Sequence, residues 1–173
     1  GRGIGCGLEA RDVLAVLEGD GPADLRSKAT SLADVLLSAC DCDESAAAIL
    51  DDGRALAKFR EIVAAQDGDP DVTEEDLPLG DHTTTITASR DGLVAHANNR
   101  LVNETARRAG APKDEGAGLA LAARVGDTVE EDEPLFTVHA ETAGKLDEAV
   151  RFARENQPLR VSGPDEALVE RYT

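Results

Sequence analysis

The chain has 173 residues, 41% of them hydrophobic, and its 35 acidic residues against 18 basic ones give a formal net charge of -17. This length and apolar content suffice for one large or two small domains with a buried core, which argues against wholesale disorder. The negative charge disfavours binding to nucleic acid or anionic lipid, and no apolar run approaches the roughly 20 residues that a membrane span requires.

Cysteine and lysine are both scarce. The three cysteines (Cys6, Cys40 and Cys42) are too few for a disulfide framework, and no signal peptide opens the chain, so we expect a reducing cytoplasm. An excess of acid with only four lysines among the basic residues indicates a halophilic source, with an acidic mesophilic protein as the alternative. The chain opens with Gly1 and contains no Met, so we expect it to begin within a longer polypeptide. A processed or tag-bearing terminus is the alternative.

The first third of the sequence predicts three helices. Apolar residues recur at helical spacing from 8 to 17, before Gly19. A second helix is expected over 24–40, and a third over about 45–66 with a break near 51–53. These segments form the helical part of a predicted α+β fold.

An acidic stretch rich in Pro and Gly, residues 67–81, predicts a linker that contains a domain boundary. The β-branched run 83–88, the turn at Asp91-Gly92 and the apolar run 93–97 predict a β-hairpin. The remaining expected elements are a helix over 99–109 ended by Gly110, strands over 118–124 and 134–140, a helix over 145–156 and a last strand over 159–161.

Four glycines at positions 1, 3, 5 and 7 precede the first predicted helix. Glycine allows backbone amides to approach an anion, and a helix N-terminus adds partial positive charge, so a phosphate could bind there. No Gly-Lys-Ser/Thr follows, and no strand is expected before the glycines. Tight packing of the backbone is therefore the favoured interpretation over anion binding.

Other residues with potential chemistry are dispersed. Cys40 and Cys42 would supply two soft ligands where tetrahedral zinc requires four. The acidic triplet at 67, 69 and 71 resembles the start of a calcium loop, but Val72 and Pro78 occupy the positions of the required Gly and Glu.

The histidines are His82, His96 and His139, without metal spacing or a recognisable nucleophile arrangement. We therefore predict no catalytic, substrate-binding or metal-binding residue from the residues alone.

Five stretches of the chain together carry the motifs of a known family. Residues 1–14 are similar to GRxIGxxLEAREAL, and residues 55–69 are similar to ALEKFREIIxAQGGD. Residues 88–99, 103–118 and 125–141 follow the order AxxDGxV, AGAPKDxGAG and VGDxVxxGDPLFTxxAE. This pattern resembles the pyrimidine-nucleoside phosphorylases, most closely their archaeal AMP phosphorylase branch, here in a haloarchaeal version.

The resemblance implies a division of the chain and a reaction. Residues 1–66 would be the helical end of the phosphorylase α/β domain, 67–81 the linker, and 82–173 a C-terminal barrel-sandwich domain with added helices. In the family, phosphate attacks the anomeric carbon of a ribosyl unit and the base leaves; in the AMP branch the products are adenine and ribose 1,5-bisphosphate. Inorganic phosphate is the co-substrate, no further cofactor is implied, and the enzymes are homodimers or larger.

The family's phosphate loop, its base-contacting Ser and Lys and its general acid all precede the first matched segment. No catalytic residue is therefore transferred to this chain, and we expect it to be inactive alone. Two departures occur: Cys6 and Gly7 replace the family's proline and alanine, and Asp132 replaces a turn glycine. Since aspartate tolerates a positive φ better than most residues, we expect the turn at Asp132 to survive.

Two other classes of protein fit parts of the sequence. Residues 125–138 resemble half of a biotinyl or lipoyl carrier domain, but such a domain needs a lysine at a hairpin tip, and Lys145 lies at the start of a predicted helix. A stand-alone, non-catalytic interaction module is the second alternative.

Overall fold

The computed structural model describes residues 1–163, and its helices and antiparallel sheets confirm the predicted α+β class. The predicted C-terminal domain (82–173) thus extends past the described residues. The chain divides into two units: Gly1 with Glu9–Leu77, and Arg2–Leu8 with the residues from Pro78. The division at Leu77 falls inside the stretch predicted as a linker, whereas the assignment of Arg2–Leu8 to the second unit has no counterpart in the sequence analysis.

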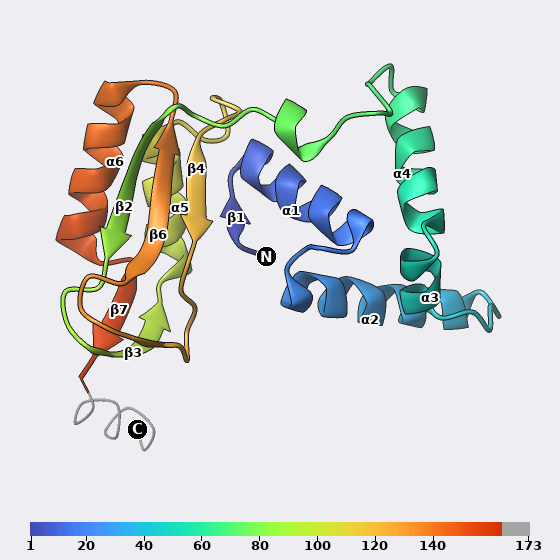
Figure 1. Cartoon of the computed structure of the whole chain (residues 1–173), viewed down its shortest axis with the longest axis horizontal. Coiled ribbons are helices and arrows are strands. Elements are labelled where there is room, and N and C mark those ends of the chain that lie inside the picture. Colours follow the sequence, from blue (N-terminus) through green and yellow to red (C-terminus); the bar gives the residue numbers. More distant parts are fainter. Residues whose placement is uncertain (164–173) are drawn as a thin grey trace. The chain divides into compact units, whose positions relative to one another are not determined.

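The first unit consists of helices (Figure 1). They are α1 (Cys6–Glu18) from Glu9 onward, α2 (Ala23–Ala39), α3 (Ala46–Asp51), α4 (Arg54–Ala65) and the short 3-10 helix η1 (Glu74–Asp76). The Ser45 hydroxyl caps α3 by accepting a hydrogen bond from the Ala48 amide at 3.1 Å. Gly53, with a left-handed φ of 83°, separates α3 from α4 and confirms the predicted break in the third helix.

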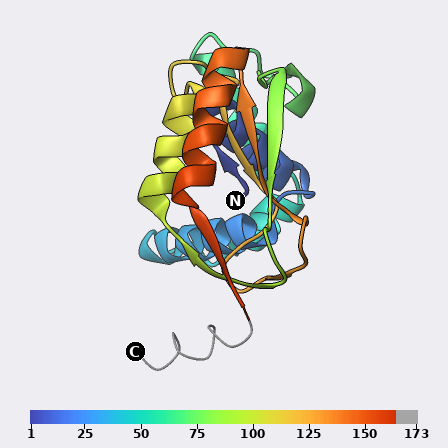
Figure 2. The ribbon, with the colours of Figure 1, turned by 90° about the vertical axis from the view of Figure 1, so that its left-hand side faces the viewer.

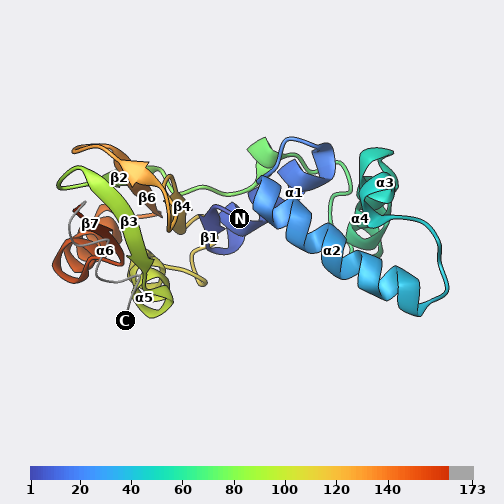
Figure 3. The ribbon, with the colours of Figure 1, turned by 90° about the horizontal axis from the view of Figure 1, so that it is seen from below.

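Helices α2 and α4 contribute no buried residue. Figure 3 shows α2 as one long helix with α3 near its C-terminal end. The apolar face predicted for α2 is largely open to solvent, since Leu32, Val35 and Leu36 are 59%, 65% and 68% exposed. The apolar face of α2 is therefore not covered by the described residues.

The second unit contains two antiparallel sheets. The four-stranded sheet has the order β1 (Gly3–Ile4), β4 (Gly118–Leu121), β6 (Pro134–Ala140) and β2 (His82–Thr87). The three-stranded sheet has the order β5 (Thr128–Val129), β3 (Gly92–Ala97) and β7 (Leu159–Ser162). Neither sheet closes on itself in this pairing, so the barrel-sandwich detail stays a prediction.

Helices α5 (Asn99–Ala109) and α6 (Ala143–Asn156) pack side by side over the strands of the second unit (Figure 2). Arg108 of α5 stacks on the Phe152 ring of α6, 4.4 Å from its centroid, and donates to Glu148 at 2.7 Å. Buried side chains of both sheets and both helices form one core, with Leu119, Phe136 and Val138 among the largest. The second unit therefore has a core of its own.

The predicted hairpin over 83–97 is wrong. β2 pairs with β6, where Ile86 faces Phe136, while β3 pairs with β5 and β7 in the other sheet. Between the two strands, the buried Ala88 donates to the Glu133 carbonyl at 2.8 Å and accepts from the Asp132 amide at 2.9 Å. These two hydrogen bonds hold the chain after β2 beside the residues that precede β6, and the chain then enters the second sheet as β3. Asp91-Gly92 is therefore not the turn of a hairpin between β2 and β3.

Candidate functional site

The glycine-rich start of the chain is used for backbone packing within the second unit. β1 adds to the free edge of β4, with Gly3 opposite Ala120 and Ile4 opposite Leu119, and the Leu121 amide donates to the Arg2 carbonyl at 2.8 Å. This strand was not predicted, because two residues are too short to show a periodic pattern.

Two of the glycines allow the close approach. A Cβ at Gly5, which has a φ of +122°, would lie 2.3 Å from the Ala117 carbonyl oxygen, and one at Gly7 would lie 2.3 Å from the Pro78 carbonyl oxygen. The Gly7 amide donates to the Glu115 carbonyl at 3.0 Å, so it is occupied by the protein itself. The packing interpretation of the glycines is therefore supported over the anion-binding one.

The cysteines, histidines and acidic triplet do not gather. Cys6, Cys40 and Cys42 are free thiols, and no group of three or more His, Cys, Asp or Glu side chains within residues 1–163 could hold a metal ion. In the acidic triplet, the Asp69 carboxylate accepts from the Asp71 amide at 2.9 Å, as in a solvent-exposed turn.

The turn before β6 contains the aspartate that replaces the family's glycine. Asp132 has a φ of +66°, so it adopts the left-handed conformation expected for this position. The Asp91 carboxylate accepts from the Glu131 amide at 2.7 Å, and the Glu133 carboxylate accepts from the Glu130 amide at 2.8 Å. The expectation that the turn survives with aspartate is confirmed.

Lys145 bears on the carrier alternative. It lies in the first turn of α6, where its ammonium group donates to the Asp114 carboxylate. The chain passes from β6 through Thr142, whose hydroxyl caps α6, without forming a hairpin tip. A carrier domain presents its lysine at the tip of a hairpin, and Lys145 does not lie at such a tip.

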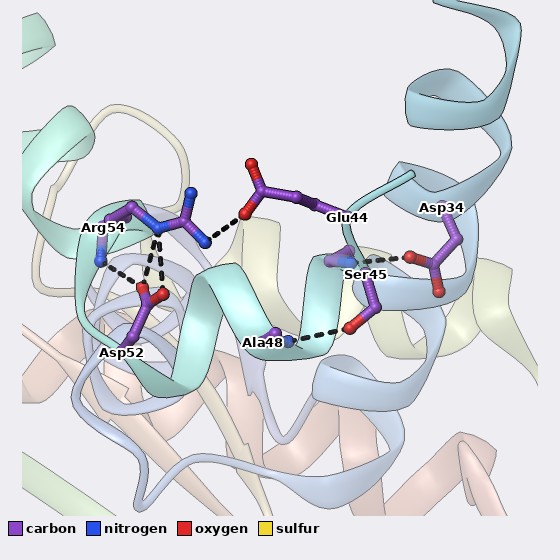
Figure 4. Close-up of polar contacts among 7 residues, drawn as sticks. Asp34, Glu44, Ser45, Ala48, Asp52 and Arg54 are labelled. Carbon is purple, nitrogen blue, oxygen red and sulfur yellow. Dashed lines mark hydrogen bonds and ion pairs between the residues drawn. The ribbon is translucent and has the colours of Figure 1, made fainter. Parts of the chain in front are cut away.

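An ion-pair network joins α3 to α4 in the first unit (Figure 4). The Arg54 guanidinium donates to the Asp52 carboxylate at 2.9 Å and to the Glu44 carboxylate. The hydrogen bond and the positive charge of Arg54 hold the pKa of Glu44 below its ordinary value, and the two carboxylates raise the pKa of Arg54. All three side chains are about half exposed, so the network orders the α3–α4 junction and has the character of a surface contact.

The first unit also contains an apolar groove of about 490 Å³. It is lined by side chains of α1, α2, α3 and the start of α4, among them Val16, Leu25, Leu36 and Leu50. Among residues 1–163, no acidic or basic side chain lines it, so this part of the chain offers no group there for acid–base chemistry. Its chemistry is that of a packing surface.

Comparison with known proteins relates both units to one family. Residues 93–160 match the pyrimidine nucleoside phosphorylase C-terminal domain. An AMP phosphorylase from Natronomonas pharaonis is 52% identical over 177 residues, which cover 99% of this chain and 35% of that protein. An AMP phosphorylase from Thermococcus kodakarensis is 44% identical, and the match covers 94% of this chain and 34% of that protein. AMP phosphorylase 2 from Archaeoglobus fulgidus is 42% identical, and the match covers 100% of this chain and 34% of that protein.

Residues 93–160, which lie in the second unit, are thus similar to the C-terminal domain of the pyrimidine nucleoside phosphorylase family. The chain is similar to the archaeal AMP phosphorylases, and it spans about a third of the length of the curated relatives it matches. The haloarchaeal relative agrees with the halophilic source expected from the charge. No helix within residues 1–163 is both long and apolar enough to cross a membrane.

Proposed function

We propose that the chain is the C-terminal portion of a nucleotide phosphorylase that converts AMP and phosphate into adenine and ribose 1,5-bisphosphate. The observation that carries this proposal is the 52% identity to an AMP phosphorylase over 99% of the chain. The matched segments lie in both units, so the similarity is not limited to the C-terminal domain.

The catalytic residues of this enzyme lie upstream of Gly1. Breaking the glycosidic bond requires a proton for the departing base and stabilisation of the charge that develops in the transition state. Glu44 and Asp76, whose pKa values are lowered, and Arg54, whose pKa is raised, are exposed surface groups, and the three histidines stand apart in sequence. This distribution supports a part that shapes or orders a site built elsewhere.

The two units have different places in the proposed enzyme. Residues 1–66 are the helical end of the α/β domain, 67–81 form the linker, and 82–173 are the C-terminal domain. The open apolar side of α2 supports the first assignment, because such a face is stable only when further chain covers it. We further propose a cytoplasmic homodimer or larger assembly that uses inorganic phosphate as co-substrate, without a cofactor or nucleic-acid partner.

The proposal is tested by measuring adenine release from AMP, with and without phosphate, for the 173-residue chain and for the complete product of its coding frame. The complete product should release adenine only with phosphate, and the chain alone should release none. CMP, UMP and adenosine, assayed in parallel, identify the preferred substrate. Adenine release by the chain alone would contradict the placement of the catalytic residues, and a complete product without phosphorolytic activity on any of the four would contradict the function.

A further inference from the structure

The loop between α5 and β4 (residues 110–117), called the clamp loop below, contacts two segments that lie far apart in the sequence. The Glu115 carbonyl accepts a hydrogen bond from the Gly7 amide at 3.0 Å. The next carbonyl, that of Gly116, accepts from the Gly80 amide at 2.8 Å. Two consecutive residues of one loop therefore hold two segments between which almost all of the first unit is inserted.

Both segments lie at junctions between the two units. The continuous part of the first unit, Glu9–Leu77, begins two residues after Gly7 and ends three residues before Gly80. Gly7, Gly80 and the clamp loop all belong to the second unit. One loop of the second unit thus fixes both ends of the helical segment.

The backbones at these two contacts approach one another directly. Gly7, Gly80 and Gly116 are buried. A Cβ at Gly7 would lie 2.9 Å from the Glu115 carbonyl oxygen, and a Cβ at Gly116 would lie 2.7 Å from the Gly80 amide nitrogen. Because neither contact has room for a side chain, a displacement of the clamp loop breaks both hydrogen bonds.

Asp114 holds the clamp loop in its conformation. Its amide donates to the Gly110 carbonyl at 3.0 Å, and its own carbonyl accepts from the Ala117 amide at 3.1 Å. Its carboxylate accepts from the ammonium group of Lys145 in α6, and the Asp114 side chain is only 11% exposed. Removing one partner of a largely buried ion pair leaves the other charge unpaired. The conformation of the clamp loop therefore depends on Lys145.

We propose that the clamp loop is a conformational device with two states. In the closed state it docks the Gly7 and Gly80 segments together, in the open state it releases both, and the ion pair between Asp114 and Lys145 stabilises the closed state. Coupling between distant segments requires such a two-state element that acts on both. The segment Glu9–Leu77 is accordingly held at both ends or released at both ends. The device uses contacts within the second unit and does not depend on the proposed phosphorolysis.

The first test is hydrogen exchange of single amides in the 15N-labelled 173-residue chain, followed by NMR at constant high salt. Exchange through local opening reports the free energy of that opening. Because one event exposes both amides, Gly7 and Gly80 should have protection factors within about twofold of each other, and lower than those at the centre of β6. Unequal protection of the two glycines, or protection as high as that of β6, would overturn the proposal.

Two variants of α6 provide the second test. Lys145→Met removes the ion pair and keeps most of the apolar side chain, so it should accelerate exchange of the Gly7 and Gly80 amides by the same factor, about tenfold, equivalent to about 1.4 kcal/mol. Glu148→Gln removes an ion pair between α6 and Arg108 of α5, outside the clamp loop, and should leave both rates unchanged.

Acceleration at only one of the two glycines, at neither of them, or by equal factors in both variants would overturn the proposal. None of these results bears on adenine release by the complete enzyme.

Discussion

The most specific structural prediction concerns Gly5, where the chain leaves β1 and enters α1. In Gly5→Ala, the new Cβ would lie 2.3 Å from the Ala117 carbonyl oxygen and 3.1 Å from the Gly118 Cα, so the backbone of one strand must move. The φ of +122° adds conformational strain of about 1–3 kcal/mol, and relieving the overlap costs about another 1–3 kcal/mol. We expect the second unit to lose about 2–6 kcal/mol of unfolding free energy.

Three further glycines of the second unit separate the two causes. Gly126→Ala has a φ of +99° and no atom within 4 Å of the new Cβ, so only conformational strain of about 1–2 kcal/mol applies. Gly7→Ala has the overlap with the Pro78 carbonyl without the positive φ and should cost about 1–3 kcal/mol. Gly144→Ala has neither and lies in the first turn of α6, so it should be neutral or stabilising by up to about 1 kcal/mol.

The assay is urea unfolding at constant high salt, followed by circular dichroism, together with hydrogen exchange of the Leu121 amide. That amide donates to the Arg2 carbonyl, so its exchange reports directly on the docking of β1. Gly5→Ala should accelerate it, and Gly126→Ala should not. The reasoning would be refuted by a Gly5→Ala variant as stable as Gly144→Ala, or by a loss no larger than that of Gly126→Ala with unchanged exchange at Leu121.

Three other predictions concern the core, a turn and an ion pair. Phe136→Ala should lower the unfolding free energy measured in urea by about 3–5 kcal/mol, because this side chain is only 1% exposed. Thr83→Ala, at an exposed residue of β2, should change it by no more than about 0.5 kcal/mol, and equal effects of the two variants would contradict the assigned core. Asp132→Val should cost about 1–2 kcal/mol more than Asp132→Gly in the same assay, because only glycine adopts the observed φ of +66° freely; a more stable valine variant would contradict the turn. Arg54→Gln should raise the pKa of Glu44 in an NMR titration, and an unchanged pKa would contradict the ion pair. Because that pKa is lowered in the folded protein, the ion pair stabilises the folded state at neutral pH, and this contribution is lost as the pH falls through the folded-state pKa.

The helices of this fold could largely be predicted from the sequence, because each carries its own signal. Apolar spacing and capping residues indicated the helices now seen as α1, α2, α5 and α6 to within a few residues. The break between α3 and α4 followed from a glycine that adopts a left-handed φ. The turn at Asp132 could be predicted too, since its requirement for a positive φ is a local property.

The pairing of strands could not be predicted in the same way. The residues from Thr83 to Ala97 have the alternation and turn residues of a hairpin, but the partner of β2 is β6, about fifty residues later. The two-residue strands β1 and β5 are too short for a periodic signal, and they exist because a sheet edge elsewhere receives them.

The central claim, that these residues are part of a longer nucleotide phosphorylase, is tested most directly by reading the coding DNA upstream of Gly1. Since the chain spans 35% of the Natronomonas relative, the account predicts an open reading frame that continues upstream for about twice the length of the chain and encodes a glycine-rich phosphate loop. A start codon immediately before Gly1 would contradict the account, and the chain would then be an independent, non-catalytic module.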